Sequence, residues 1–228
     1  FILEIMKIKI DRLSIQNFFL YLYFFSINFE NFNPTGYFSL SKLAGILYIS
    51  VAILSTKVFL SLNRQQLYFY WPILLFVFYL TTISVINFND FSTRFIDIAF
   101  ILNLLIFMVL INHVRKDSLV LEKGMFALAI GSIAVSVLMF LGIGLTEVPE
   151  DSLGLINRKG FFNAGLNEIA LKLSAGLVVI ISLLYENTFK LKKWTKILLA
   201  MAVPLLIISI LGTASRTAFL ILPICGLT

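Results

Sequence analysis

Three basic residues of this largely apolar chain are candidates for binding an anionic ligand. Arg216 lies in a polar segment, residues 211–220, between two uncharged apolar runs. Arg158 and Lys159 lie next to each other in the longest polar stretch, residues 146–167. A guanidinium presents paired hydrogen-bond donors that match a phosphate group, and an ammonium adds a point charge. If the three cations share one side of a membrane, they suit a doubly anionic ligand such as a lipid-linked diphosphate.

Small and hydroxylated side chains precede Arg216. Thr213 and Ser215 can donate hydrogen bonds, and Gly212 lets the backbone turn closely, so the segment fits a tight re-entry of the chain at a membrane boundary. An arginine at bilayer depth costs from ~2.5 to more than ~10 kcal/mol unless it faces water, protein or an anion. The same residues also fit an interfacial anchor in a short turn, and the two other cations fit solvated loop charges.

Glu168 and Lys172 are four residues apart inside an apolar run. On a helix they share one face, with the acidic residue first, which is the favourable order for an ion pair. A pair within a membrane helix should face protein or a cavity and not lipid. Structural pairing and a role in a binding site both fit this spacing.

The remaining ionisable residues predict no metal site. Glu147, Glu150 and Asp151 could hold a divalent cation, but loop carboxylates without a ligand spacing pattern fit solvated charges better. His113 is the only histidine, and Cys225 is the only cysteine. The sequence contains no phosphate-binding glycine loop and no zinc-protease helix, which argues against a nucleotide-driven pump or a zinc site.

The elements that must position these residues are membrane helices. The chain has 228 residues, of which 60% are hydrophobic and 13% charged, and its mean hydropathy is +0.98. A soluble domain of this length could not bury so much apolar surface, so we expect an all-α, polytopic membrane protein, with residues 1–228 in a single transmembrane domain. The apolar runs predict seven complete crossings, at residues 13–29, 37–56, 67–86, 95–112, 124–145, 166–185 and 197–211, and a truncated eighth from about 217.

The basic residues are distributed unevenly between the loops. Twelve of the eighteen Lys and Arg residues fall in the N-terminal lead and in the loops after the second, fourth and sixth apolar runs. Because basic residues concentrate on the cytoplasmic side, we expect a cytoplasmic N-terminus, with residues 146–167 and 211–220 on the outer face. This bias explains most of the +6 net charge, so no nucleic-acid partner is expected.

The ends of the sequence predict a piece of a longer protein. The chain begins with Phe1, with Met6 as an alternative start, and Thr228 ends it inside an apolar run. The basic lead after Met6 has no small-residue cleavage site behind it. The first apolar run is therefore expected to be retained as a crossing helix.

Two motifs carry a family resemblance. Residues 158–170 read Arg-Lys-Gly-Phe-Phe-Asn-Ala-Gly-Leu-Asn-Glu-Ile-Ala, and residues 213–216 read Thr-Ala-Ser-Arg, one loop and one helix later. Together with the order of the apolar runs, they resemble the bacterial O-antigen ligase and polymerase family. That family shows an Arg, a Gly with an aromatic residue, then Asn-Pro-Asn leading into a helix, and later Thr-x-Ser-Arg at the start of another span. This chain departs from the pattern at Leu166, where Pro is usual.

The resemblance implies a GT-C-like helical enzyme at the periplasmic face of the bacterial inner membrane. It would transfer a glycan from an undecaprenyl-diphosphate carrier to lipid A-core or to a growing polysaccharide, without metal or other cofactor. By resemblance, Arg216 and Arg158 engage the diphosphate with Lys159 beside them. The supporting residues would be Thr213, Ser215, Asn167, Glu168 and Lys172, with Asn167 ordering the entry of its helix. The family's catalytic His lies in a later external loop, beyond Thr228, so we expect residues 1–228 to be inactive alone.

A carrier or flippase for an anionic lipid-linked or small solute is the alternative from another class. Such a protein would place charged residues along several helices and in both halves of the membrane. Here the apolar runs are nearly free of charge apart from Glu168 and Lys172. A purely structural membrane anchor would leave the two outer arginines without a role.

Overall fold

The computed structural model describes residues 12–31, 39–54, 71–72, 75–76, 78–79, 82, 91–147, 159–161, 165–185 and 191–213. The chain divides into two compact units. Unit 1 comprises Phe1–Leu20 with Lys42–Leu121, and unit 2 comprises Tyr21–Ser41 with Glu122–Thr228. The first helix, α1 (Arg12–Ser26), begins in unit 1 and ends in unit 2.

Unit 1 is built from the first part of α1, from α2 (Leu40–Leu54) and from α4 (Phe91–Lys116). The expected crossings at 13–29, 37–56 and 95–112 correspond to these helices. Helix α4 is longer than its apolar run because its last turn carries His113, Arg115 and Lys116, whose positive charge suits a helix C-terminus. The expected crossing at 67–86 is helical at each described position between 71 and 82.

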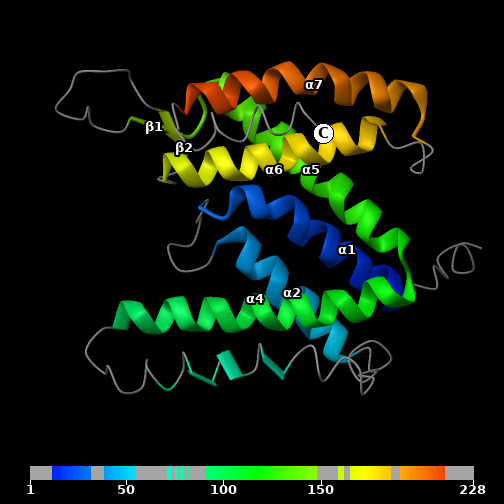
Figure 1. Cartoon of the computed structure of the whole chain (residues 1–228), viewed down its shortest axis with the longest axis vertical. Helices are drawn as coiled ribbons and strands as arrows, with labels where there is room; N and C mark the ends of the chain where they lie inside the picture. The colour runs from blue at the N-terminus through cyan, green and yellow to red at the C-terminus, as the bar shows by residue number, and fades with distance from the viewer. Residues whose placement is uncertain are drawn as a thin grey trace, which may run out of the picture. The chain divides into compact units, whose positions relative to one another are not determined.

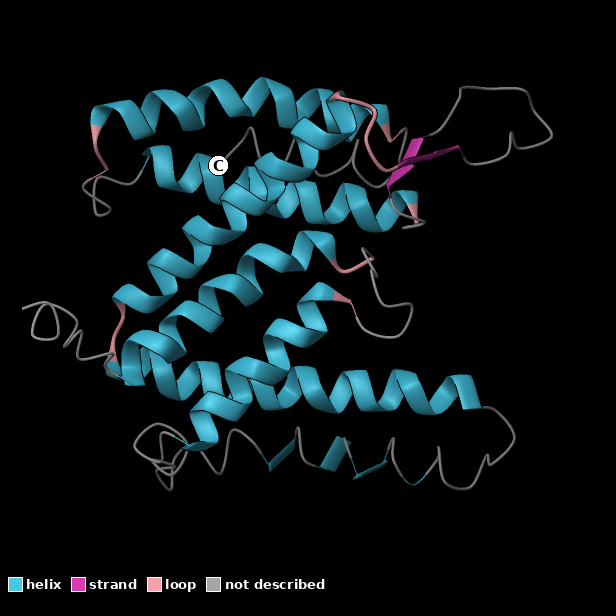
Figure 2. Cartoon of the chain, turned by 180° about the vertical axis from the view of Figure 1, so that it is seen from behind, coloured by secondary structure: helices cyan, strands magenta, loops and turns pink. Residues whose placement is uncertain are grey.

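Unit 2 contains three longer helices, α5 (Leu119–Phe140), α6 (Leu166–Tyr185) and α7 (Lys193–Gly212). Helix α6 has the bounds expected from the sequence. One face of α6 is buried, and its leucine and isoleucine residues pack against the buried residues of α7. The connection between α6 and α7 is short, so the two helices lie side by side and antiparallel (Figure 1). Figure 2 shows the same pair from behind.

Small residues bring α5 close to its neighbours in unit 2. A methyl group on Gly176 of α6 would collide with the side chain of Ser132 on α5. A methyl group on Gly131 would likewise collide with the backbone carbonyl of Phe25, in the last turn of α1. Asn28, in the short 3-10 helix η1 (Ile27–Phe29), donates a hydrogen bond to the Leu128 carbonyl at 3.3 Å. Such contacts between small residues are the usual way for membrane helices to pack tightly.

The expected end of the fifth crossing at residue 145 is wrong by several residues. Helix α5 ends at Phe140, and Gly142 adopts a positive φ of 75°. The Ile143 amide donates to the Leu138 carbonyl at 2.9 Å, and the Gly142 amide donates to the Met139 carbonyl at 3.1 Å. This pattern is a Schellman helix end, which glycine forms without steric cost. Hydropathy missed it because the apolar side chains continue past the turn.

A short antiparallel ribbon interrupts the otherwise helical structure, and the all-α expectation did not include it. Strand β1 (Leu145–Glu147) pairs with β2 (Lys159–Phe161), so that Glu147 lies opposite Lys159. The ribbon places the start of the long polar stretch beside residues 159–161, which lie within it. It fixes the backbone of Lys159 in unit 2.

Three described helices are long and apolar enough to cross a membrane. They are Leu119–Phe140, Asn167–Tyr185 and Lys193–Gly212, and the shorter Leu40–Leu54 is also apolar. Large apolar side chains are exposed along α7, including Trp194, Leu198 and Met201. Their exposure is what a lipid environment would accommodate. The structure thus supports a helical membrane protein.

Candidate functional site

One end of the α6–α7 hairpin brings together the described parts of both sequence motifs. Helix α6 begins at Leu166 and α7 ends at Gly212, and in an antiparallel pair these termini share one end (Figures 1 and 2). Strand β2 contacts α6 at the same end. Phe161 anchors the strand, since its side chain is buried in the core that also contains Ile169. We call this region the hairpin end.

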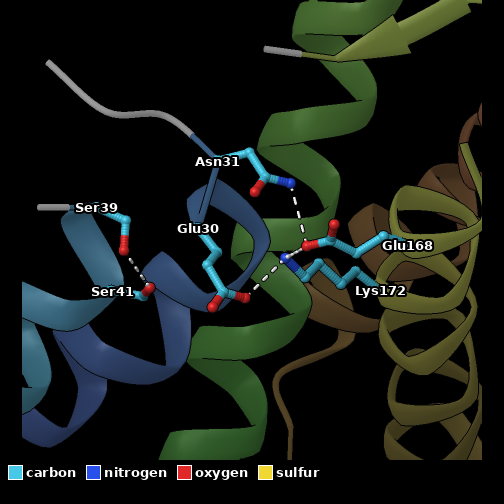
Figure 3. A network of polar contacts seen from close by, with 6 residues as sticks. All are labelled: Glu30, Asn31, Ser39, Ser41, Glu168 and Lys172. Carbon is cyan, nitrogen blue, oxygen red and sulfur yellow. Dashed lines mark hydrogen bonds and ion pairs between the residues drawn. The ribbon is translucent and has the colours of Figure 1, made fainter. Parts of the chain in front are cut away.

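A network of four polar side chains lies at the hairpin end, across α6 and the segment after η1 (Figure 3). Lys172 Nζ lies 2.6 Å from Glu168 Oε1 and 2.9 Å from Glu30 Oε2. Asn31 Nδ2 donates to Glu168 Oε1 at 3.1 Å. The helical pair expected from the spacing of Glu168 and Lys172 is therefore confirmed. It extends to a segment more than a hundred residues away.

The charges of this network do not favour an anion at Lys172. Its ammonium is largely buried, with 16% of the side chain exposed, and two carboxylates bind it. With Glu30 and Glu168 ionised, the three charges sum to minus one. The carboxylates are 41% and 45% exposed, so solvent screens them and each ion pair is worth about 1 kcal/mol or less. The network therefore fits a role in holding α6 against the segment after η1.

Thr213 closes the last turn of α7. Its side chain is buried, and its hydroxyl donates to the Ile210 carbonyl at 2.7 Å. Its backbone amide donates to the same carbonyl at 3.1 Å. Thr213 thus caps the C-terminus of α7.

The start of α6 is set by backbone geometry. The Gly165 carbonyl accepts hydrogen bonds from the amides of Glu168 and Ile169, at 3.0 and 3.1 Å. Asn167, the residue expected to order this entry, is exposed in the first turn, one residue after the helix begins. Gly165 occupies the position before the helix, where a capping residue would stand.

Three of the expected site residues, Arg158, Ser215 and Arg216, lie outside the described residues, as does the expected eighth crossing. For Lys159 the structure gives the backbone, in β2. Thr213, Asn167, Glu168 and Lys172 are described, and all belong to unit 2.

Sequence reasoning missed Glu30 and Asn31. Both follow the first apolar run, on the side of the membrane to which residues 146–167 were assigned. The carboxylate of Glu30, directly after an apolar run, could have indicated a polar contact, because a charge near a membrane helix needs a partner. No feature of the sequence near Glu30 identified Lys172 as that partner.

No group of three or more His, Cys, Asp or Glu side chains that could hold a metal ion occurs in the part of the chain that the structure describes. Comparison with protein-family models, with curated proteins and with solved structures gives no match. The case for a function therefore depends on the motifs and on the geometry of the hairpin end.

Proposed function

We propose that the chain is the donor-binding part of a membrane glycan transferase of the O-antigen ligase or polymerase type. In this proposal it crosses the bacterial inner membrane seven times and begins an eighth crossing, with its N-terminus in the cytoplasm. The hairpin end faces the periplasm. There it binds an undecaprenyl-diphosphate-linked glycan, which is transferred to lipid A-core or to a growing polysaccharide.

The observation that supports this most is the shared end of α6 and α7. The two motifs are separated by the whole of α6 and its loop, yet Lys159 of the first and Thr213 of the second belong to elements that meet at the hairpin end. Arg158 directly precedes Lys159, and Arg216 follows Thr213 by three residues. Since one residue spans at most about 3.6 Å, the Cα atom of Arg216 is within about 11 Å of that of Thr213.

The roles of the charged residues divide accordingly. Lys172 is already bound by two carboxylates, so the diphosphate would be bound by Arg158, Lys159 and Arg216. These cations stabilise the negative charge that develops on the diphosphate as the glycan leaves it. In this proposal Glu168 and Lys172 position α6, and Thr213 and Ser215 support Arg216 in binding the diphosphate.

The experiment that tests the proposal replaces Arg216 in the full-length gene in its host. Arg216→Ala and Arg216→Lys are compared with Lys193→Ala, which removes an exposed cation at the opposite end of α7. Surface glycan and lipid-linked intermediates are then analysed together. Because a lysine keeps the charge but loses the paired donors, we expect Arg216→Lys to fall between Arg216→Ala and the control.

Two outcomes would support the proposal, and they also distinguish a ligase from a polymerase. Full-length polymer that accumulates on the carrier with a bare acceptor identifies a ligase, and single repeat units on the acceptor identify a polymerase. Unchanged glycan at a normal protein level in Arg216→Ala would overturn the proposal. The carrier hypothesis would then be the better one.

A further inference from the structure

His113 is a buried base in unit 1, and the proposed glycan transfer makes no use of it. It is the only histidine of the chain and is fully buried in the last turn of α4. Its Nδ1 lies 3.1 Å from the hydroxyl of Tyr48, on α2. The two rings are stacked, with centroids 6.1 Å apart and an interplanar angle of 15°.

Tyr48 extends this contact to a third helix. The Tyr48 side chain is fully buried and also forms a hydrogen bond with the side chain of Gln16, near the start of α1. Gln16 is itself fully buried. A polar chain, Gln16–Tyr48–His113, thus links α1, α2 and α4 inside an apolar unit. Buried polar chains specify packing when every member is satisfied and weaken it when one is not.

The hydrogen bonds indicate which imidazole tautomer is present. If Nδ1–H donates to the Tyr48 oxygen, His113 Nε2 keeps a bare lone pair. The other tautomer would leave an N–H at Nε2. Among the residues that the structure describes, His113 Nε2 has no hydrogen-bond partner. A buried, unpaired donor costs about 1–3 kcal/mol, so the tautomer with the proton on Nδ1 is favoured.

Protonation at Nε2 would put a cation into this packing, and its Nε2–H has no hydrogen-bond partner among the residues that the structure describes. The neighbouring groups from α1 and α2 are Gln16 and Tyr48, and neither is charged near neutral pH. Asp117, just after α4, favours the protonated form, whereas Lys116 opposes it. Arg115, in the same turn, adds another positive charge. Burial without a partner destabilises such a cation, and a movement of the end of α4 away from α1 and α2 would let water hydrate it.

We propose that His113 is a protonation switch that holds the end of α4 against α1 and α2 when it is neutral and releases it when it is charged. The packing of these three helices then follows the pH on the side of the membrane where α4 ends. The proposal is independent of the glycan chemistry at the hairpin end. It depends on residues of unit 1 alone.

Nuclear magnetic resonance of the whole chain in detergent, labelled with 15N only at histidine, tests the first half of the proposal. A single histidine gives a single spin system, so no assignment is needed. We expect a neutral imidazole with the proton on Nδ1 at about pH 7.5, and protonation below the usual histidine value of about 6.5. A charged ring at neutral pH, or a proton on Nε2 in the neutral ring, would overturn the proposal.

Hydrogen exchange of the α4 backbone tests the second half. After correction for intrinsic exchange, protection of the last turns of α4 should fall about tenfold or more between about pH 7.5 and pH 5 in the wild type. His113→Gln keeps an amide donor for Tyr48 but cannot be protonated, and it should stay protected throughout. Asp117→Asn is the matched control, because it removes the nearby carboxylate but keeps His113, and it should retain a pH response that is shifted to lower pH.

Equal pH responses in the wild type and in His113→Gln would contradict the switch. So would protection in the wild type that does not change with pH. If His113→Gln fails to fold, Tyr48→Phe provides the second variant. It removes the acceptor for Nδ1–H while His113 remains, so its α4 should be less protected than the wild type already at neutral pH, and full protection there would contradict the proposal.

Discussion

Lys172 Nζ lies 2.9 Å from Glu30 Oε2, although the two residues are 142 positions apart in the chain. The bond joins the segment after η1 to α6, the helix that also contacts the strand carrying Lys159. It therefore connects the first and the last parts of unit 2. Whatever binds at the hairpin end depends on the position of α6 that this contact helps to fix.

Removal of Lys172 should destabilise the protein more than removal of Glu30. Lys172→Met leaves Glu30 and Glu168 close together without a compensating charge, whereas Glu30→Gln leaves the Glu168–Lys172 pair intact. We expect losses of about 1–2 kcal/mol and about 0.5 kcal/mol, respectively, because the carboxylates are partly solvated. Thermal unfolding in detergent measures both.

The double variant Glu30→Gln with Lys172→Met provides the control. Because the two side chains are in contact, their effects should not be additive, and the coupling should be at least about 0.5 kcal/mol. Strict additivity would show that the ion pair does not form in the membrane-protein preparation.

Gly176 should not tolerate a side chain. Gly176→Ala places a methyl group against Ser132 of α5, and we expect a loss of about 1–3 kcal/mol of stability. Ser132→Gly in the same chain should recover part of that loss, since it removes the atoms in conflict. Gly212→Ala is the matched control, because no atom lies within 4 Å of its added methyl group, and it should change the unfolding temperature little.

Gly142 should resist substitution for a different reason. Its surroundings are open, but its φ of 75° is unfavourable for an L-residue. We expect Gly142→Ala to lose about 1 kcal/mol, and Gly142→Asn to lose less, because asparagine enters this region more readily. If both variants match the wild type in thermal unfolding, the helix end does not have the glycine-dependent geometry described.

Stability should fall in mild acid because of His113, which lies beyond the expected crossing of residues 95–112. Burial lowers the pKa of His113, with Asp117 opposing and Lys116 reinforcing the shift. Between the ordinary value of about 6.5 and the lower folded value, the unfolded chain binds a proton that the folded chain does not. Stability is therefore complete above that window and is lost as the pH falls through it.

Unfolding temperatures recorded from about pH 8 to pH 5 measure this effect. His113→Gln removes the titrating group, so its profile should be flatter than that of the wild type over the same range. Parallel profiles would assign the acid sensitivity to other groups.

The sequence predicted those features that depend on neighbouring residues in the chain. The bounds of α6 follow from an apolar run between polar stretches, and the Glu168–Lys172 pair follows from helical spacing. Helix α7 begins four residues earlier than expected, at Lys193, because cations and Trp194 can occupy a helix at a membrane interface as well as a loop. Strands β1 and β2 have three residues each, too few for a periodic pattern to reveal.

The long-range contacts could not be predicted. Glu30 and Lys172 meet only because α6 packs beside η1, and a single sequence has no signal for such a pairing. The same holds for Tyr48 and His113, which come from different helices, and neither residue has a sequence pattern that indicates the other as its partner. The sequence shows His113 only as the single histidine, and its burial against Tyr48 is a property of the packing alone.

The contact of Gly176 with Ser132 has a mechanical consequence. With no room for even a methyl group between them, α5 and α6 cannot slide or roll past each other at this point without a steric collision. The two helices are therefore tightly packed against each other at this contact. A relative motion of α5 and α6 would therefore first have to separate Gly176 from Ser132.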